Sequence, residues 1–371
     1  MKSKKIIKKL LEYADIKING NRPWDIQIHN DKAFSRILAN PSLGLGESYV
    51  NEWWDCKELD TFFYKVLRAR LDQKLKGNLS LAFAALSRSL INQQTKKKAK
   101  NVGKVHYDVG NDLYEKMLDK RMAYTCGYWE SAKNLDDAQE AKLDLICRKV
   151  GLRPGMKVLD IGCGWGSFLQ FAGEKYGIEG VGVTISREQV QLGNEKTKGL
   201  PVEIRFQDYR DVRGQFDAIV SVGMFEHVGP KNYHTFIKQV HRNLKDDGLF
   251  LLHTIGSHFK IASDGDPWLN KYIFPGGITP SQSQVMKSVE DIFVMEDWHN
   301  FGVHYSKTCK EWYNRFVANW GALKHDYDER FYRIWSYYLL SCVGSFKARN
   351  SQLWQIVFSK KGVLDGYTSV R

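Results

Sequence analysis

A run of nine residues, VLDIGCGWG at 158–166, constrains the fold of this chain more than any other stretch. Apolar residues typical of a buried strand lead directly into three glycines at alternate positions, and residues 167–172 then have the pattern of a helix. Glycine adopts backbone angles that other residues avoid and places no Cβ in the way of a ligand. Main-chain N–H groups at the start of the helix can therefore face a ligand. We predict a strand, a glycine turn and a helix that cradle a nucleotide-like cofactor; a tight turn without a ligand is the alternative.

Strands and helices alternate through the rest of this region. Helical spacing is clear at 136–150, 187–198 and 233–244. The segments with a strand pattern are Lys157–Ile161, Gly180–Thr184, Val202–Gln207, Phe216–Val222, Gly248–Thr254, Phe293–Trp298 and Leu353–Lys360. This order predicts an α/β fold with a doubly wound, seven-stranded, mostly parallel sheet, in which the late strands can pair antiparallel.

Charge divides the chain unevenly. Residues 1–104 hold 21 lysines and arginines and 10 aspartates and glutamates, which is +11 of the net charge of +13. A segment at 92–104, NQQTKKKAKNVGK, is rich in lysine and lacks core residues. We predict a smaller N-terminal domain, α/β or mainly helical, over 1–91, a linker over 92–104 and a catalytic domain over 105–371. The basic N-terminal domain predicts an anionic partner, either a lipid surface or a nucleic acid.

The first residues do not have the pattern of a secretion signal. Apolar and lysine side chains alternate at helical spacing over 4–13, which predicts a basic amphipathic helix that either lies on anionic lipid or packs on its own domain. The chain has no run of 18 apolar residues, and its six cysteines show neither paired spacing nor a zinc pattern. We therefore expect a cytoplasmic protein with no metal site and no membrane span.

Seven motifs in order carry a resemblance to a known family. They are YTCGYW at 124–129, LDIGCGWG at 159–166, GVTIS at 182–186, QDYRD at 207–211, VSVGMFEHVG at 220–229, LLHTIG at 251–256 and EDWHNFGVHY at 296–305. The glycine loop is similar to the first motif of class I S-adenosylmethionine methyltransferases. The set as a whole, with GLGESYVNEWW at 44–54, resembles cyclopropane-fatty-acyl-phospholipid synthases. This resemblance implies transfer of a methylene unit from S-adenosylmethionine to a cis double bond of a phospholipid acyl chain.

The resemblance also implies a bound bicarbonate ion as the group that accepts a proton when the ring closes. The matching ligands are Cys126, Glu226, His253, the main chain of Ile255, and Tyr305. Independently, Glu226 directly follows a predicted strand, so it lies at the edge of the sheet where doubly wound folds bind ligands.

For the cofactor, the resemblance assigns Tyr124 and Thr125 to the methionyl end, with Gly162 and Gly164 against the backbone and Asp160 in the strand before them. The second strand ends in Thr184, where the dinucleotide fingerprint has an acid. The resemblance implies that this threonine and Gln189 bind the ribose hydroxyls of the cofactor instead. Gln207 and Asp208 follow the third strand, and Asp208 is placed to accept from the adenine amino group.

The resemblance also implies a pocket for the acyl chain, built from aromatic residues that follow the fifth strand. They are Tyr272, Phe274, Trp298, Phe301, Trp312 and Phe316. A cation formed on the acyl chain can be stabilised by such rings.

Two other functions stay open. One is methyl transfer to another acyl chain or to a small molecule, and the other is nucleic-acid binding by the basic N-terminal region. The cyclopropane synthase interpretation is favoured over both. It implies a membrane surface as the partner, peripheral association with the inner face of that membrane, no nucleic acid, and a homodimer as in the family.

Overall fold

The computed structural model describes residues 2–71, 110–259 and 265–371, which fall into two compact units. Among the described residues, one unit comprises 2–71, 265–275 and 305–351, and the other comprises 110–259, 276–304 and 352–371. The predicted linker at 92–104 lies outside the described residues.

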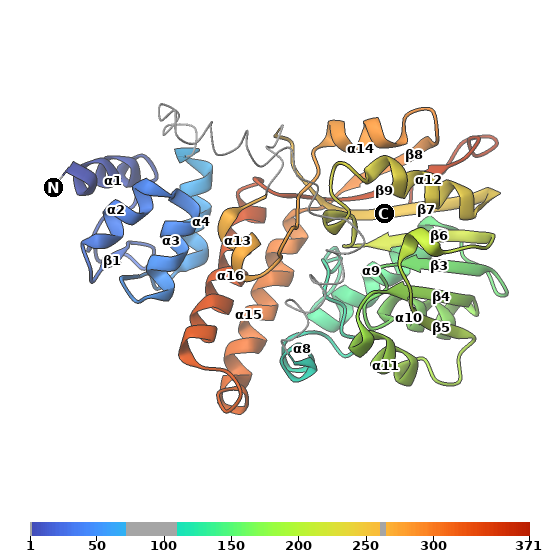
Figure 1. The fold of residues 1–371 in the computed structure, drawn as a ribbon, viewed down its shortest axis with the longest axis horizontal. Coiled ribbons are helices and arrows are strands. Elements are labelled where there is room, and N and C mark those ends of the chain that lie inside the picture. Colours follow the sequence, from blue (N-terminus) through green and yellow to red (C-terminus); the bar gives the residue numbers. More distant parts are fainter. Residues whose placement is uncertain (1, 72–109, 260–264) are drawn as a thin grey trace. The chain divides into compact units, whose positions relative to one another are not determined.

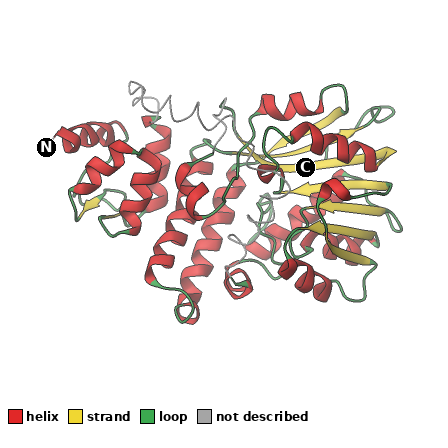
Figure 2. Cartoon of the chain, viewed as in Figure 1, coloured by secondary structure: helices red, strands yellow, loops and turns green. Residues whose placement is uncertain are grey.

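A seven-stranded sheet forms the centre of the second unit (Figure 1, Figure 2). Its order is β5-β4-β3-β6-β7-β9-β8, with the first five strands parallel and β9 antiparallel to both of its neighbours. The strands are β3 (Lys157–Ile161), β4 (Glu179–Thr184), β5 (Val202–Phe206), β6 (Phe216–Val222), β7 (Leu244–Gly256), β8 (Val294–Asn300) and β9 (Gln352–Ser359). The predicted doubly wound sheet is confirmed, including the antiparallel late strands.

Helices cover both faces of this sheet because successive strand residues point to opposite sides. On β3, Val158 joins one apolar core and Leu159 joins the other. The first core includes residues of α9 (Leu135–Lys149) and α10 (Ser167–Tyr176), and the second includes residues of α12 (Tyr233–Asn243) and α14 (Gln282–Val289). The remaining elements of this unit are α8 (Asn111–Met117), α11 (Arg187–Lys196), η1 (Tyr209–Asp211) and η2 (Phe225–His227).

The first unit is mainly helical. Its elements are α1 (Lys2–Tyr13), β1 (Gln27–Ile28), α2 (Lys32–Ala39), α3 (Pro41–Val50), β2 (Trp54–Asp55), α4 (Leu59–Arg68), α13 (Pro267–Tyr272), α16 (Glu329–Lys347) and, from Tyr305 onward, α15 (Val303–Leu323).

Two segments that the predicted domain boundaries assign to 105–371, residues 265–275 and 305–351, cluster with the N-terminal residues. Helix α16 packs against α4 closely enough that a Cβ on Gly344 would lie 2.5 Å from Cβ of Phe63. Trp268 packs in the same way against Gly46 of α3, where a Cβ would lie 2.3 Å from the indole. Gly46 and Gly344 thus lie inside helices, where the absence of a side chain permits close packing.

Helix α1 packs on its own unit. Ile7 and Leu11 are buried, whereas Lys5, Lys8 and Lys9 are exposed. Across the described ranges, no helix combines the length and apolar character needed to cross a bilayer.

Candidate functional site

The glycine loop lies where β3 ends and α10 begins, as predicted. Gly162, Gly164 and Gly166 all have positive φ, at 82°, 56° and 79°. A Cβ on Gly162 would lie 2.5 Å from Cβ and Cγ of Met224, so this position excludes any side chain. A Cβ on Gly164 would meet no protein atom within 4 Å. The loop is therefore packed on one side and open on another, which suits a backbone that faces a ligand.

Asp160, two residues before the loop, is buried beside a buried lysine. Burial raises the pKa of Asp160 to about 7, and the nearby charge of Lys142 opposes that rise. Lys142 is 2% exposed, and burial lowers its pKa to about 8. Its ammonium donates to Oγ1 of Thr125 over 2.9 Å. Lys142 thus links the predicted methionyl end of the site to the strand that carries the loop.

Sequence reasoning did not identify Lys142. It lies four residues after Ala138 and four before Ile146, on the helix face predicted to be buried. A lysine on an apolar helical face is the signal that could have found it, because a lysine is almost never fully buried unless it is paired.

The predicted cofactor residues Tyr124 and Thr125 come just before α9. The ring of Tyr124 lies 5.2 Å from that of Tyr114, which in turn lies 5.0 Å from Trp165 in the glycine loop. The carbonyl of Thr125 accepts from Nε2 of Gln139 over 2.7 Å, and its methyl group packs on Gly223 at the end of β6.

The predicted ribose pair is in contact. Oγ1 of Thr184 donates to Oε1 of Gln189 over 2.6 Å, and both side chains are buried. Ser186 caps α11 by accepting from the N–H of Gln189, which fixes the start of that helix.

Asp208 and Gln207 follow β5. The Gln207 N–H donates to the carbonyl of Thr184 over 3.0 Å, which extends the sheet edge. The carboxylate of Asp208 accepts from Nε and Nη2 of Arg210 over 2.8 and 2.7 Å. Arg210 was not predicted, and it already holds both oxygens of the residue assigned to adenine.

Glu226 lies in η2, beyond the end of β6. Its Oε1 accepts from the N–H of Ile255 over 2.6 Å, while its buried Oε2 has no hydrogen-bond partner among the described residues. Burial raises the pKa of Glu226 to about 7. The main-chain N–H assigned to an anion by resemblance therefore already contacts Glu226, and Oε2 is the carboxyl atom left to meet a ligand.

His253 lies on β7, two residues before Ile255, and is 1% exposed. Its Nδ1 lies 3.3 Å from Nε2 of Gln355, and its buried Nε2 has no partner in the described part of the chain. Burial lowers its pKa well below the usual range, and the charges of Lys142 and Lys149 lower it further. The ring is therefore neutral at physiological pH.

The other two predicted anion ligands lie in different units. Cys126 is fully buried in the second unit, and its thiol donates to the carbonyl of Gly127 over 3.2 Å. Tyr305 belongs to the first unit, in the first turn of α15, where its ring stacks on Phe346 with 4.5 Å between centroids.

The aromatic residues assigned to the acyl pocket also divide between the units. Tyr272, Phe274, Trp312 and Phe316 lie in the first unit, whereas Trp298 and Phe301 lie in the second. The Phe301 ring centroid is 6.0 Å from that of His253, so one of these aromatics is close to a candidate site residue.

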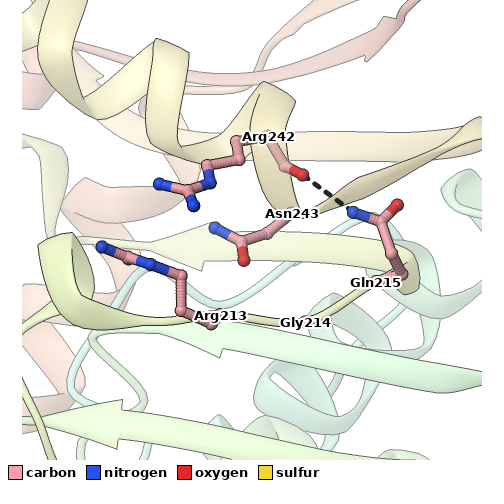
Figure 3. A pocket seen from close by; sticks show the side chains of 5 residues that line it. All are labelled: Arg213, Gly214, Gln215, Arg242 and Asn243. Carbon is pink, nitrogen blue, oxygen red and sulfur yellow. Dashed lines mark hydrogen bonds between the residues drawn. The ribbon is translucent and has the colours of Figure 1, made fainter.

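A pocket of about 330 Å³ lies away from these residues (Figure 3). Its lining residues Arg213, Gly214, Gln215, Arg242 and Asn243 directly precede β6 and β7. They are thus at the amino ends of parallel strands, the edge opposite to the glycine loop. Within the described ranges, no cluster of histidine, cysteine and acidic side chains could hold a metal ion.

Comparison with known proteins identifies the family. Residues 93–356 match the model of mycolic acid cyclopropane synthetases. The chain is 53% identical over 367 residues to the Escherichia coli K12 cyclopropane-fatty-acyl-phospholipid synthase, covering 99% of this chain and 96% of that protein. It is also 37% identical to a sphingolipid C9-methyltransferase of Emericella nidulans over 69% of this chain and 52% of that protein.

Solved structures agree with this assignment. The mycolic acid cyclopropane synthase CmaA1, complexed with SAH and CTAB, matches with a TM-score of 0.66 and 32% identity over 70% of this chain and 98% of that one. The cyclopropane synthase MmaA2 from Mycobacterium tuberculosis matches with a TM-score of 0.66 and 28% identity over 70% of this chain and 98% of that one. The chain therefore belongs to the cyclopropane synthase family of S-adenosylmethionine-dependent methyltransferases.

Proposed function

We propose that this enzyme transfers a methylene unit from S-adenosylmethionine to the cis double bond of a phospholipid acyl chain and closes a cyclopropane ring. The observation that carries the proposal is 53% identity to a cyclopropane-fatty-acyl-phospholipid synthase along almost the whole of both chains. The sphingolipid methyltransferases match a smaller share of this chain at lower identity.

Several groups at the sheet edge suit S-adenosylmethionine, which supplies an electrophilic methyl group when bound. The open side of Gly164 suits close approach to the backbone, and the Thr184–Gln189 pair offers buried polar atoms to a ribose. Thr125, held by Lys142, suits the methionyl end. Tyr124, Asp160, Gln207 and Asp208 complete the proposed cofactor site.

The residues around Glu226 fit a bound bicarbonate, which supplies a proton acceptor of moderate basicity. Two buried polar atoms, Oε2 of Glu226 and Nε2 of His253, have no partner among the described residues. Such atoms are costly unless a ligand pairs with them. Burial raises the pKa of the Glu226 carboxyl to about 7, which favours the protonated form that can donate to an anion.

Chemistry explains why a base is needed at this place. An alkene that accepts a methyl group becomes a carbocation, and ring closure requires loss of a proton from the added methyl group. Without a base, the product is a methyl branch or an alcohol. Within the second unit, Glu226, His253, Cys126 and the main chain of Ile255 are the groups we propose to hold that base.

A product assay tests the proposal. Incubation with S-adenosylmethionine, bicarbonate and unsaturated phospholipid vesicles should add one CH₂ per modified chain, as measured by mass spectrometry. Resistance of the product to ozonolysis should show that the double bond has been lost. Bicarbonate-free buffer should reduce turnover. A CH₂ gain with a retained double bond would instead assign the enzyme to methyl branching.

We also propose that the N-terminal region, residues 1–91, docks the enzyme on the inner face of the membrane as a homodimer. Because Ile7 and Leu11 are buried within the unit, the exposed lysines of α1 support electrostatic attraction without insertion of the helix. Each is worth about 1 kcal/mol at best near an anionic leaflet, and screening acts within about 8 Å.

Substitution of Lys5, Lys8 and Lys9 by glutamine in the full chain tests docking, because these lysines are exposed and their removal leaves the packed face of α1 intact. The binding constant for anionic vesicles should fall by up to about 150-fold, because the three lysines together contribute about 3 kcal/mol at best. Added salt should weaken vesicle binding further, and light scattering gives the oligomeric state. Unchanged vesicle binding, or stronger competition by RNA than by vesicles, would refute lipid docking.

A further inference from the structure

Three polar residues form a row across neighbouring strands of the sheet. His253 of β7 is in register with Gln355 of β9, and Gln355 is in register with His299 of β8. His253 and Gln355 are 1% and 0% exposed, whereas His299 is half-buried, so the His253 end of the row is the one inside the protein. A buried amide between two imidazoles is expensive unless its hydrogen bonds are made.

The contact between Gln355 and His253 sets the position of a proton. The amide is oriented with its Nε2 3.3 Å from Nδ1 of His253 and with its buried Oε1 unpaired among the described residues. Because an amide nitrogen can only donate, Nδ1 of His253 accepts in this orientation. In a neutral imidazole, one nitrogen carries the proton and the other accepts. The proton of His253 is then on Nε2, the atom that has no partner among the described residues.

The charges around the row favour a neutral ring. The ammonium of Lys149, on α9 and 0% exposed, lies 3.2 Å from Nδ1 of His299 and 3.3 Å from Oδ2 of Asp297. Asp297 also accepts from Arg371 over 2.7 and 2.8 Å, so its carboxylate is shared between two cations. Lys142 is the second ammonium that acts on His253.

We propose that Gln355 is a positioning residue that holds His253 in the tautomer with its proton on Nε2, so that His253 donates a hydrogen bond to the anion bound beside Glu226. This inference rests on the proposed bicarbonate site. A ring with the opposite tautomer would present a lone pair to an anion and repel it.

The tautomer can be read without any activity. Long-range proton–nitrogen NMR of the full chain, with labelled histidine and with His253→Asn to identify the signal, should show a neutral ring protonated on Nε2. A wild-type ring protonated on Nδ1 overturns the inference, whatever the enzyme catalyses.

Two variants test the consequence for the anion. Gln355→Glu supplies an acceptor in place of the donor, which should draw the proton to Nδ1. Gln355→Leu removes the donor altogether. We expect the half-saturating bicarbonate concentration to rise at least about tenfold in the glutamate variant, which corresponds to about 1.4 kcal/mol, and less in the leucine variant. Affinity for S-adenosylmethionine should stay within about twofold of the parent, which is less than one hydrogen bond contributes.

Gln352→Glu is the matched control. Gln352 is buried on the same strand, three residues earlier and hence on the opposite face, where its Oε1 accepts from Asn300 over 2.8 Å. The same chemical change there should leave the bicarbonate dependence as in the parent.

The outcomes separate the inference from the function on which it rests. If the parent enzyme makes the ring without any dependence on bicarbonate, the proposed anion site fails. If the parent depends on bicarbonate but Gln355→Glu has the same bicarbonate dependence, or Gln352→Glu changes it equally, the role of Gln355 is refuted. Should the glutamate variant fail to fold, the leucine variant and the wild-type tautomer still decide.

Discussion

The cofactor loop and the candidate anion site lie at the same edge of one sheet but are built in different ways. The loop is nine consecutive residues whose backbone makes the site, with Gly162 packed against Met224. The candidate anion site draws on side chains from separate elements, Glu226 of η2 and His253 of β7, and Gln355 of β9 contacts His253 from behind. Its closest contacts, Glu226 to Ile255 and Gln355 to His253, join residues that are 29 and 102 positions apart.

This contrast shows which kind of site a sequence can specify locally. A loop that works through its backbone must use glycine, so its composition reveals it. A pocket that works through buried side chains depends on which strands are neighbours, and spacing along the chain does not contain that information. The two sites should therefore respond differently to substitution: the loop should be lost completely, whereas the pocket should lose function in part while the fold persists.

The largest effect is expected at the loop. Gly162→Val places a β-branched side chain at φ 82° and within 2.5 Å of Met224, so both backbone strain and a clash oppose it. We expect S-adenosylmethionine affinity to fall more than about 1,000-fold, since the loop must move to relieve more than 4 kcal/mol. Calorimetric titration measures this.

Gly155→Val is the control for strain alone. Gly155 has φ 78° in the turn before β3, and a Cβ there meets no atom within 4 Å. It should cost stability and leave cofactor affinity unchanged. Equal losses of affinity in the two folded variants would contradict the assignment of residues 158–166 as the cofactor loop.

The next largest effect is expected at the anion site. Glu226→Gln keeps the oxygen that accepts from the Ile255 N–H and removes the acidic function at the other atom. Turnover should fall about 100- to 1,000-fold, as for loss of one group in a preorganised polar site, while cofactor affinity stays near that of the parent. Steady-state turnover and calorimetry measure the two quantities. Turnover at the parent rate would eliminate Glu226 from the proposed site.

Much of the second unit could be predicted from the sequence because its signals are local. The predicted and observed bounds of β3 and β6 agree, and the order of strands follows from the alternation with helices. The sequence could not predict that α16 belongs to the first unit. Its packing against α4 depends on Gly344, which lies against residues almost 300 positions earlier in the chain. Lys142 and Gln355 were missed for a related reason: each is polar in a buried pattern, and only the fold shows its partner.

A third effect concerns the pH dependence of stability, which depends on the buried acid of the candidate anion site, Glu226. The folded-state pKa of Glu226 is raised to about 7 from an ordinary value of 4.5. Protonated Glu226 therefore stabilises the fold fully below pH 4.5, and this stabilisation is lost as pH rises through 7. Relative to the parent, Glu226→Gln should gain about 2 kcal/mol in unfolding free energy between pH 5 and pH 8.

Urea unfolding of both proteins at four pH values measures that gain. Asp160 is shifted in the same direction and is present in both proteins, so it cancels in the difference. A difference that stays constant across this range would mean that Glu226 titrates normally, and the proposed donation by its protonated form would then fail.

The smallest effect is expected at Asp208, which follows a strand end, as the glycine loop does, but is proposed to act through its side chain, as Glu226 does. The carboxylate follows a strand end and was assigned to adenine by sequence, yet in the structure it accepts from Arg210 and from the N–H of that residue. A contact to adenine would add one hydrogen bond from a neutral amino group to this charged acceptor, worth about 1.5 kcal/mol. Asp208→Ala should therefore weaken S-adenosylmethionine binding about tenfold.

Arg210→Gln distinguishes recognition from local structure, because it removes the ion pair and keeps the carboxylate. If Asp208 contacts adenine, calorimetry should show a loss of affinity in Asp208→Ala and little change in Arg210→Gln. If Asp208 only orders the turn at η1, the two variants should lose affinity alike, because each breaks the same pair. In that case, the adenine assignment must move to another residue, and the cofactor site would rest on the backbone of the loop and on the Thr184–Gln189 pair.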